Sequence, residues 1–309
     1  MPEYPSFVQF PHPGGEHSPD RGGKIGWNKT HRNNSNRVNP HRRKFMQLRG
    51  DWIDTGDNKH CGELCAWGEW EPESELISSL DPPEDGFPRY LWRPYWVPKD
   101  SYRGLHNTDP FIFGDCFAYS NCGQSAQSKQ GLKDLGRGSV IAFGSGRMIG
   151  GKRKWVLDTV LVVSDSFQYD PRNPRLALEG KVSDTFLSVT GGPLADWAKN
   201  ERRGPASGSC APKSERLRLY RGATPDDPVC GMYSFFPAKP AGDGSSFQRP
   251  AISLDDDYFN PCNWQAPKGA GRNRPPDELR RIWNRLVAIV RSNDLVLGTC
   301  AELPKPHNQ

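Results

Sequence analysis

The sequence has few apolar residues and no long apolar run. Hydrophobic residues make up 35% of its 309 positions, and no stretch approaches the roughly 20 apolar residues that a membrane span needs. The first residues, Met-Pro-Glu-Tyr-Pro-Ser-Phe, lack the positively charged start and the apolar run of a secretory signal. We therefore expect neither a membrane protein nor a secreted one, and predict that the eight cysteines are reduced thiols in a cytoplasmic protein.

The motifs of common binding modules are also absent. The sequence shows no internal repeat, no helix-turn-helix, no zinc finger and no phosphate-binding loop. Scattered His and Cys residues offer a weak metal candidate, made of His60, Cys61, Cys65, Cys116 and Cys122. Because their Cys-x3-Cys and Cys-x5-Cys spacings are looser than those of structural zinc sites, we expect thiols packed in the core. We predict neither a metal nor another cofactor.

Glycine and proline are abundant instead, with 32 Gly and 29 Pro. This composition favours short strands and many ordered loops over long helices. Residues 138–144 and 155–163 are β-rich runs separated by a glycine-containing basic turn, which predicts a pair of strands joined as a hairpin. We predict an α+β fold with a bent mixed or antiparallel sheet, or a partly open barrel, and few helices. With no clean linker in the sequence, residues 1–309 are expected to form a single compact domain.

One helix is strongly indicated near the end of the chain, over residues 275–293. Prolines and acids mark its start, and apolar residues from Leu279 to Val290 recur at helical spacing. Residues 295–297 are a candidate closing strand. Further short strands are predicted at 111–113, 185–189, 217–220 and 232–236.

Positive charge gathers at the start of the chain and negative charge directly after it. Residues 1–50 contain nine Lys or Arg, three acids and four of the seven histidines, whereas residues 61–75 contain five Glu and no Lys or Arg. Basic side chains collect phosphates, and carboxylates beyond them can act on a sugar or base. The boundary suggests a basic, loop-rich segment, residues 1–60, leading into an acidic pocket. The alternative is a solvated surface with no substrate.

The turn at residues 13–17, Pro-Gly-Gly-Glu-His, supplies the first candidate catalytic groups. Its glycines allow the backbone to approach a ligand closely. Glu16 and His17 are therefore candidates to bind a ligand or to transfer protons. Adjacent residues on an extended turn often point apart, which is the alternative interpretation.

The run Trp-Gly-Glu-Trp-Glu at residues 67–71 supplies the second group. An extended conformation would place Trp67, Glu69 and Glu71 on one face, with the two carboxylates about 7 Å apart. Such a pair can divide the work, one acid activating water and the other stabilising a cationic sugar-like transition state. The alternative is an ordinary half-buried strand whose glutamates lie in water.

Residues 113–122 supply a third group, because they follow a predicted strand and contain an acid, a phenol and an amide. Asp115 is the rival catalytic carboxylate, since strand ends that lead into glycine turns often carry function. A buried Asp that caps a loop is equally plausible.

Aromatic and basic side chains are the candidate substrate contacts. The basic clusters are spread along the chain and interleaved with aromatics, as expected where several loops converge on a phosphate backbone. Their alternative role is to keep the protein soluble. The predicted contacts are Trp27, Asn28, Trp67, Trp70, Tyr119, Arg42, Arg43, Lys44, Lys152, Arg153 and Lys154.

Residues 13–17 and 67–71 together resemble the nucleotide-modification-associated proteins found near phage DNA-hypermodification and bacterial defence genes. The resemblance covers roughly the first half of the chain and carries over no catalytic residues. That family is linked to enzymes that act on modified bases, including glycosylases that excise glucosylated hydroxymethylcytosine. The resemblance implies an antiviral enzyme whose partner is modified phage DNA.

A second resemblance involves Leu-Tyr-Arg-Gly at residues 219–222 and Glu-Trp-Glu at residues 69–71. The first is similar to the strand that holds the nicotinamide dinucleotide in ADP-ribosyltransferases, and the second to their catalytic Glu-x-Glu. The order along the chain is reversed relative to that family, and no Ser-Thr-Ser strand follows. An ADP-ribosyltransferase-like enzyme is therefore an alternative function.

The preferred hypothesis is a DNA glycosylase that flips a modified nucleotide and hydrolyses its N-glycosidic bond. An acid of residues 67–71, or its rival Asp115, would activate water or stabilise the sugar cation. Glu16 and His17 would orient the base or protonate its departure, and the tryptophans of residues 67–71 would stack on it. A non-catalytic reader of the same modified base is a further alternative.

Overall fold

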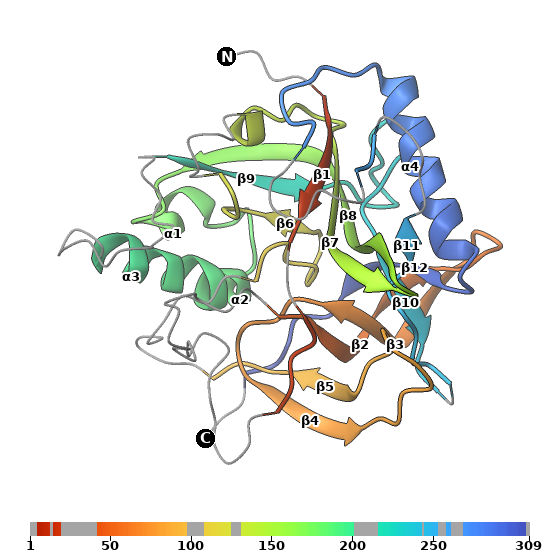
Figure 1. The fold of residues 1–309 in the computed structure, drawn as a ribbon. Coiled ribbons are helices and arrows are strands. Elements are labelled where there is room, and N and C mark those ends of the chain that lie inside the picture. Colours follow the sequence, from red (N-terminus) through yellow and green to blue (C-terminus); the bar gives the residue numbers. More distant parts are fainter. Residues whose placement is uncertain are drawn as a thin grey trace.

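Two mixed sheets and a few helices form the protein (Figure 1). The computed structural model describes residues 5–12, 15–19, 42–97, 108–124, 131–200, 216–242, 244–252, 258–260 and 268–306. The α+β class is confirmed. One sheet closes partly into a ring, and neither forms a barrel. No helix in the described ranges has the length and apolar character that crossing a membrane requires.

The first sheet has the strand order β1-β7-β8-β9-β6, with β11 also paired to β8. Its strands are β1 (Phe7–Pro11), β6 (Ala118–Tyr119), β7 (Val140–Ile149), β8 (Lys152–Tyr169), β9 (Leu217–Gly222) and β11 (Ala251–Ile252). β1 runs parallel to β7, whereas the other pairs are antiparallel. β7 and β8 form the predicted hairpin. The turn is shorter than expected, because Gly150 and Gly151 adopt positive φ angles of 57° and 71° and let the strands extend to it.

The second sheet has the order β12-β10-β3-β2-β5-β4. Its strands are β2 (Lys44–Ile53), β3 (Lys59–Gly68), β4 (Ser74–Ser79), β5 (Tyr90–Pro94), β10 (Phe236–Pro240) and β12 (Val296–Ala301). β12 also pairs with β2, which partly closes the sheet. The segment 1–60 is thus less loop-rich than expected: β1 and β2 lie in it, because their short apolar stretches are buried.

The predicted C-terminal helix is present as α4 (Pro276–Arg291), which buries the apolar stripe from Leu279 to Val290 along one side of the molecule. The other helices are α1 (Pro174–Leu178), α2 (Asp184–Phe186), η2 (Leu187–Gly191) and α3 (Gly192–Asn200). The strand predicted at 185–189 is wrong. Ser183 caps a helical start there, with its hydroxyl accepting from the Phe186 N–H at 3.1 Å, so local capping outweighs the β propensity of the run.

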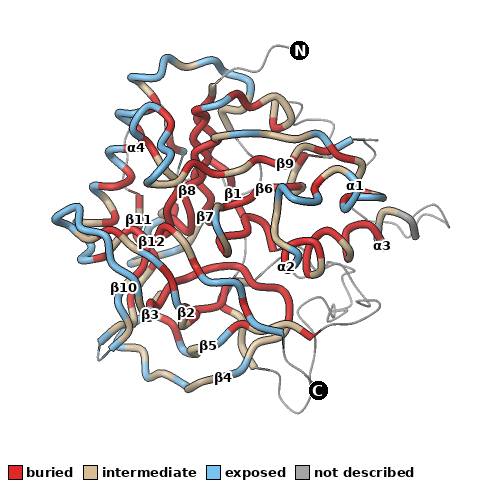
Figure 2. Tube along the Cα trace, turned by 180° about the vertical axis from the view of Figure 1, so that it is seen from behind, coloured by how far each residue is buried: buried red, intermediate tan, exposed pale blue. Residues whose placement is uncertain are grey.

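Burial is greatest in β1, in residues 140–145 of β7 and in residues 155–163 of β8, whereas β4 and the outer side of α4 are exposed (Figure 2). Two apolar clusters make up the core. Trp70 belongs to one and Trp67 to the other. Several charged side chains are also buried where the sheets meet, namely His12, Arg43, Glu69, Asp158 and Arg249. Burial of an isolated charge is costly, so a buried cluster of paired charges is a candidate functional site.

Candidate functional site

Three strand ends meet between the two sheets. His12 follows β1, and its N–H donates to the Gly144 carbonyl of β7 at 2.6 Å. Arg43 directly precedes β2 and Glu69 directly follows β3. Since Lys44 pairs with Gly68 in the antiparallel register, Arg43 and Glu69 are the next facing positions. The register of one hairpin therefore delivers a guanidinium and a carboxylate to the end of β1.

Arg43 is the centre of a buried ionic network. Its Nη1 donates to Glu69 Oε2 at 2.8 Å, its Nε to Asp158 Oδ2 at 3.0 Å, and its Nη2 to the His12 carbonyl at 2.9 Å. Burial opposes the charge, but Glu69 and Asp158 outweigh it and raise the pKa of Arg43. The guanidinium thus stays charged and joins β8 of the first sheet to β3 of the second.

Asp158 extends this network on the first sheet. Its Oδ1 accepts from Arg249 Nη1 at 2.8 Å, and the same Nη1 donates to Ser145 Oγ at 3.1 Å. The Arg249 guanidinium also lies 5.5 Å from the centre of a Trp67 ring. Burial works against ionisation of Asp158, but Arg249 and Arg43 lower its pKa overall. Asp158 is therefore held as a carboxylate inside an otherwise apolar stretch of β8.

His12 connects this network to a thiol. Its Nδ1 lies 3.0 Å from Glu69 Oε2, and its Nε2 lies 3.6 Å from the sulfur of Cys122. The His12 and Glu69 side chains are buried, whereas Cys122 is partly exposed. A nucleophile within reach of a base, with that base oriented by a third group, is the arrangement used in covalent catalysis. We name Cys122, His12, Glu69, Arg43, Asp158 and Arg249 the thiol centre.

The turn that carries Cys122 is fixed by its own hydrogen bonds. The carboxylate of Asp109 accepts from the N–H groups of Ser120, Asn121 and Cys122 at 2.8, 3.0 and 2.7 Å. The Tyr119 hydroxyl donates to the Cys122 carbonyl at 2.7 Å. Burial raises the pKa of Asp109 to about 6, even though these three N–H donors and the Cys122 side chain favour its charged form. These hydrogen bonds therefore hold the turn, and with it Cys122, in a fixed position.

Glu16 lies beside the thiol centre but turns its carboxylate away from it. The Arg43 N–H donates to the Gly15 carbonyl at 2.9 Å, and Glu16 bridges Arg43 through its backbone. Glu16 Oε1 accepts from the N–H of Arg89 at 2.6 Å and that of Tyr90 at 3.1 Å. These contacts fasten the turn to β5 and explain the position of Glu16 better than proton transfer does.

His17 and Lys44 form the next layer outward. The His17 N–H donates to the Arg43 carbonyl at 2.8 Å, and its ring lies 5.2 Å from that of Trp92. Burial, with smaller contributions from Lys44 and Arg42, lowers the pKa of His17 to about 3. Burial likewise lowers the pKa of Lys44 to about 7. A neutral imidazole at this position is a packing group rather than an acid.

The aromatic residues of the 67–71 motif do not provide a stacking surface. Trp67 is 3% exposed and Trp70 is 0% exposed. The indole N–H of Trp70 donates to the Glu73 carbonyl at 2.9 Å, and that of Trp67 to the Phe247 carbonyl at 2.9 Å. β3 ends at Gly68, so the strand alternation expected for residues 67–71 stops there. Glu71 is buried as well, and its backbone N–H donates to the Thr108 hydroxyl at 3.1 Å.

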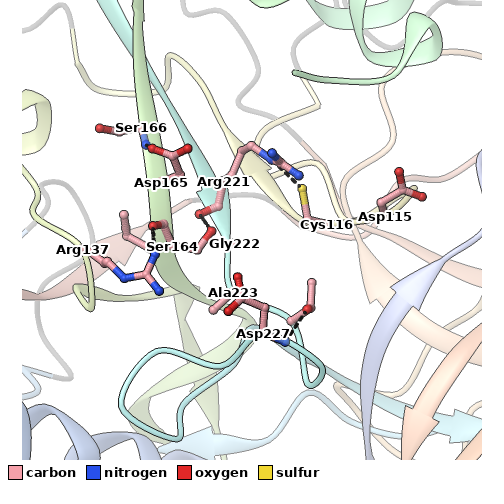
Figure 3. A pocket seen from close by; sticks show the side chains of 12 residues that line it. Asp115, Cys116, Arg137, Ser164, Asp165, Ser166, Arg221, Gly222, Ala223 and Asp227 are labelled. Carbon is pink, nitrogen blue, oxygen red and sulfur yellow. Dashed lines mark hydrogen bonds between the residues drawn. The ribbon is translucent and has the colours of Figure 1, made fainter. Parts of the chain in front are cut away.

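Asp115 belongs to a different place, a cavity of about 560 Å³ (Figure 3). The guanidinium of Arg221 points to Cys116, with Arg221 Nε donating to its sulfur at 3.2 Å. This hydrogen bond raises the pKa of Arg221. Asp165 also lines the cavity. None of the thiol centre residues lines this Arg221 cavity, so Asp115, the rival candidate, lies at a different site from Glu69.

The other predicted contacts are scattered. Tyr119 is fully buried and supports the Cys122 turn, which does not fit a substrate contact. Lys152 is exposed and Lys154 partly buried near the β7–β8 turn, and Arg42 is partly buried beside the Glu16 carbonyl. Trp27, Asn28 and the side chain of Arg153 lie outside the described residues.

Sequence reasoning gave no catalytic or binding role to His12, Asp109, Asp158 and Arg249, and it named Cys122 only as a metal candidate. Asp158 had a detectable signal, since it is the one charged residue in the apolar run 155–163. A charge at such a position indicates a buried ion pair. Cys122 had a weaker signal, because it precedes a glycine just after a strand. Nothing local distinguishes Arg249.

No group of three or more His, Cys, Asp or Glu side chains in the described ranges is arranged to hold a metal ion. His60, named with Cys61 as a metal candidate, instead pairs with Asp54 at 2.8 Å and stacks on Trp52. Comparison with protein-family models, curated proteins and solved structures finds no match for this chain.

Proposed function

We propose that this protein is a thiol-dependent enzyme that transfers or hydrolyses acyl groups, with Cys122 as nucleophile and His12 as general base. The observation that carries the proposal is the line of contacts from Cys122 Sγ to His12 Nε2, at 3.6 Å, and from His12 Nδ1 to Glu69 Oε2, at 3.0 Å. Such a line is recognised by geometry rather than by order in the sequence. Arg43 fixes Glu69, and the Glu69 carboxylate, at ion-pair distance from the imidazole, would orient it.

The reaction would proceed in two balanced steps. Nε2 of His12 takes the proton of the Cys122 thiol, and the sulfur forms a bond to the acyl carbon. The bond from that carbon to the leaving amine or alkoxide breaks, and the leaving group takes the proton from His12. His12 then deprotonates a water that attacks the thioester carbon. The carbon–sulfur bond breaks, the carboxylic acid leaves, and the Cys122 sulfur takes the proton back from His12.

A generic activated ester tests this proposal without knowledge of the natural substrate. On incubation with p-nitrophenyl acetate, we expect release of p-nitrophenol and an acetyl group on the Cys122 peptide, seen by mass spectrometry. Cys122→Ser should abolish both, and His12→Gln should slow the release by about a hundredfold, the usual range for losing a general base. Cys116→Ser is the matched control. Acetylation confined to the exposed Cys61 or Cys230 would contradict the proposal.

Cleavage of an N-glycosidic bond in modified DNA is the second candidate. It is favoured by the gathering of Glu69 and Asp158 with Arg43 and Arg249 beside the turn that carries Glu16. An ionised carboxylate held in this way suits the stabilisation of a sugar cation better than it suits proton donation. Glu69 would take that role, with His12 next to it.

Substitutions at Glu69 and Cys122 distinguish the acyl-transfer enzyme from the glycosylase. Modified and unmodified phage DNA is incubated with the protein, and alkali-labile sites are counted. A glycosylase that relies on Glu69 should lose cleavage in Glu69→Gln and keep it in Cys122→Ser. If neither DNA acquires abasic sites but p-nitrophenyl acetate is hydrolysed, the glycosylase is rejected and the acyl-transfer enzyme is supported.

A further inference from the structure

A third arginine faces the thiol centre from β7. Ser145, which accepts a hydrogen bond from Arg249 at 3.1 Å, lies two residues before Arg147 on the same strand. Side chains two apart on a strand share a face, so Arg147 lies next to Arg249 on the side of the sheet that carries the centre. β7 and β8 remain in register here, with Arg147 facing Lys154.

Around Arg147, the arginines of the described residues outnumber the carboxylates that pair with them. Asp158 is shared between Arg43 and Arg249, and Glu69 pairs with Arg43. Arg147 makes no ion pair with any residue in the described ranges. Burial, followed by repulsion from Arg249, lowers the pKa of Arg147 to about 10, although the carboxylates of Asp158 and Glu16 act to raise it.

Arg249 has donor capacity left over as well. Arg249 is 5% exposed, and its Nη1 donates hydrogen bonds to Asp158 and Ser145. Its Nη2 is buried and has no hydrogen-bond partner within the described part of the chain. A buried guanidinium nitrogen without an acceptor is unfavourable, and an anion placed between Arg249 and Arg147 would satisfy it.

We propose that Arg147 and Arg249 bind a phosphate group of the substrate that Cys122 acts on. The inference rests on the proposed function, since it assigns the substrate class of that same centre. Paired guanidinium groups suit phosphate, whose several oxygens accept from two planar forks at once. The substrate would then be a phosphate-bearing molecule, either a free nucleotide or a nucleic-acid strand.

Inorganic phosphate is the first probe. Thermal unfolding is followed while sodium phosphate is titrated against sodium chloride at equal ionic strength, because a ligand of the folded state raises the melting temperature. We expect a rise specific to phosphate, with the half-saturating concentration at least about tenfold higher in Arg147→Gln, a loss that corresponds to one charge-assisted contact. Lys152→Gln removes one exposed cation from the same hairpin and should leave the titration unchanged.

Either of two results would overturn the proposal: no phosphate-specific rise in the wild type, or an unchanged titration in Arg147→Gln. Competition identifies the source, since 5′-AMP but not adenosine should displace phosphate for a free nucleotide, and a short single-stranded oligodeoxynucleotide should do so for a nucleic acid. If neither competes, the site holds an adventitious ion only and the substrate class is rejected.

Cys122→Ser separates this inference from the proposed function. This variant should keep the phosphate titration while losing acetylation by p-nitrophenyl acetate. Retained phosphate binding with an unreactive Cys122 in the wild type would reject the acyl enzyme alone. A reactive Cys122 without phosphate binding would reject the phosphate site alone.

Discussion

Two cysteines of this protein lie next to basic groups, and their partners differ in kind. Cys122 lies 3.6 Å from the imidazole of His12, whereas Cys116 lies 3.2 Å from the guanidinium of Arg221. An imidazole can take a proton and return it, but a guanidinium remains protonated. Arg221 can thus stabilise a thiolate without cycling a proton. The chemistry of the partner, more than its proximity, distinguishes the thiol centre from the Arg221 cavity.

Their surroundings differ in the same sense. The thiol centre is buried between two sheets, and its carboxylates are held by buried arginines. The Arg221 cavity is lined by residues such as Asp165, which is exposed. Burial makes each charge depend on its partner, whereas solvent screens charges in an open cavity.

The largest expected difference between the two regions is in stability. Asp158→Asn leaves Arg43 and Arg249 without their shared carboxylate, and we expect it to lower the free energy of unfolding by about 3 to 5 kcal/mol. Asp165→Asn should change it by no more than about 0.5 kcal/mol. Urea denaturation measures both. Equal effects would show that the buried network adds nothing to the fold.

The next difference is in pH dependence. The folded pKa of His17 is about 3, below its ordinary value of 6.5, so the unfolded chain binds the extra proton. Its contribution to stability is full above pH 6.5 and is lost as the pH falls toward 3, by up to about 1.4 kcal/mol per pH unit. In His17→Gln, the free energy of unfolding measured from pH 7 to pH 4 should fall less steeply. The described residues that line the Arg221 cavity include no histidine, so Asp165→Asn should keep the wild-type slope.

A smaller effect is expected on thiol reactivity. Removal of the base in His12→Gln should slow alkylation of Cys122 by iodoacetamide at neutral pH about tenfold, because less thiolate forms. Arg221→Gln should alter labelling of Cys116 and leave Cys122 unaffected. Peptide mass spectrometry over time resolves the two cysteines. Equal labelling of Cys122 in wild type and His12→Gln would break the assignment of His12 as base.

The smallest effect is expected for Cys116→Ser. Its thiol is partly exposed and contacts the Arg221 side chain at the cavity, so the free energy of unfolding should change by less than about 0.5 kcal/mol. Reaction of Cys122 with p-nitrophenyl acetate should persist. Loss of that reaction would place Cys116 in the chemistry and reverse the comparison.

Periodicity predicted the elements whose signal is local. The stripe from Leu279 to Val290 predicted α4, and two β-rich runs predicted the β7–β8 hairpin, because burial of one face imposes those periods. It failed at 185–189, where a Ser183 cap and packing turned β-branched residues helical. Composition predicted the α+β class because abundant glycine and proline interrupt helices and strands and so favour short elements joined by loops.

The candidate site was less accessible to sequence reasoning. Glu16 and Glu69 do lie near each other, but each contacts Arg43, and they do not line a shared pocket of acids and indoles. Both indoles went into the core because large apolar rings gain most from burial. The geometry on which the proposed function depends instead joins His12 and Cys122, which are 110 positions apart.

The sequence by itself determined the amphipathic helix, the hairpin, the glycine turns and the boundary between basic and acidic segments, since each depends on neighbours along the chain. Only the tertiary structure decided which charges would be buried together. The β2–β3 register set Arg43 against Glu69, and the parallel pairing of β1 with β7 brought His12 to them. Ion pairing and proton transfer act over a few ångströms of space, and distance along the chain does not report that separation.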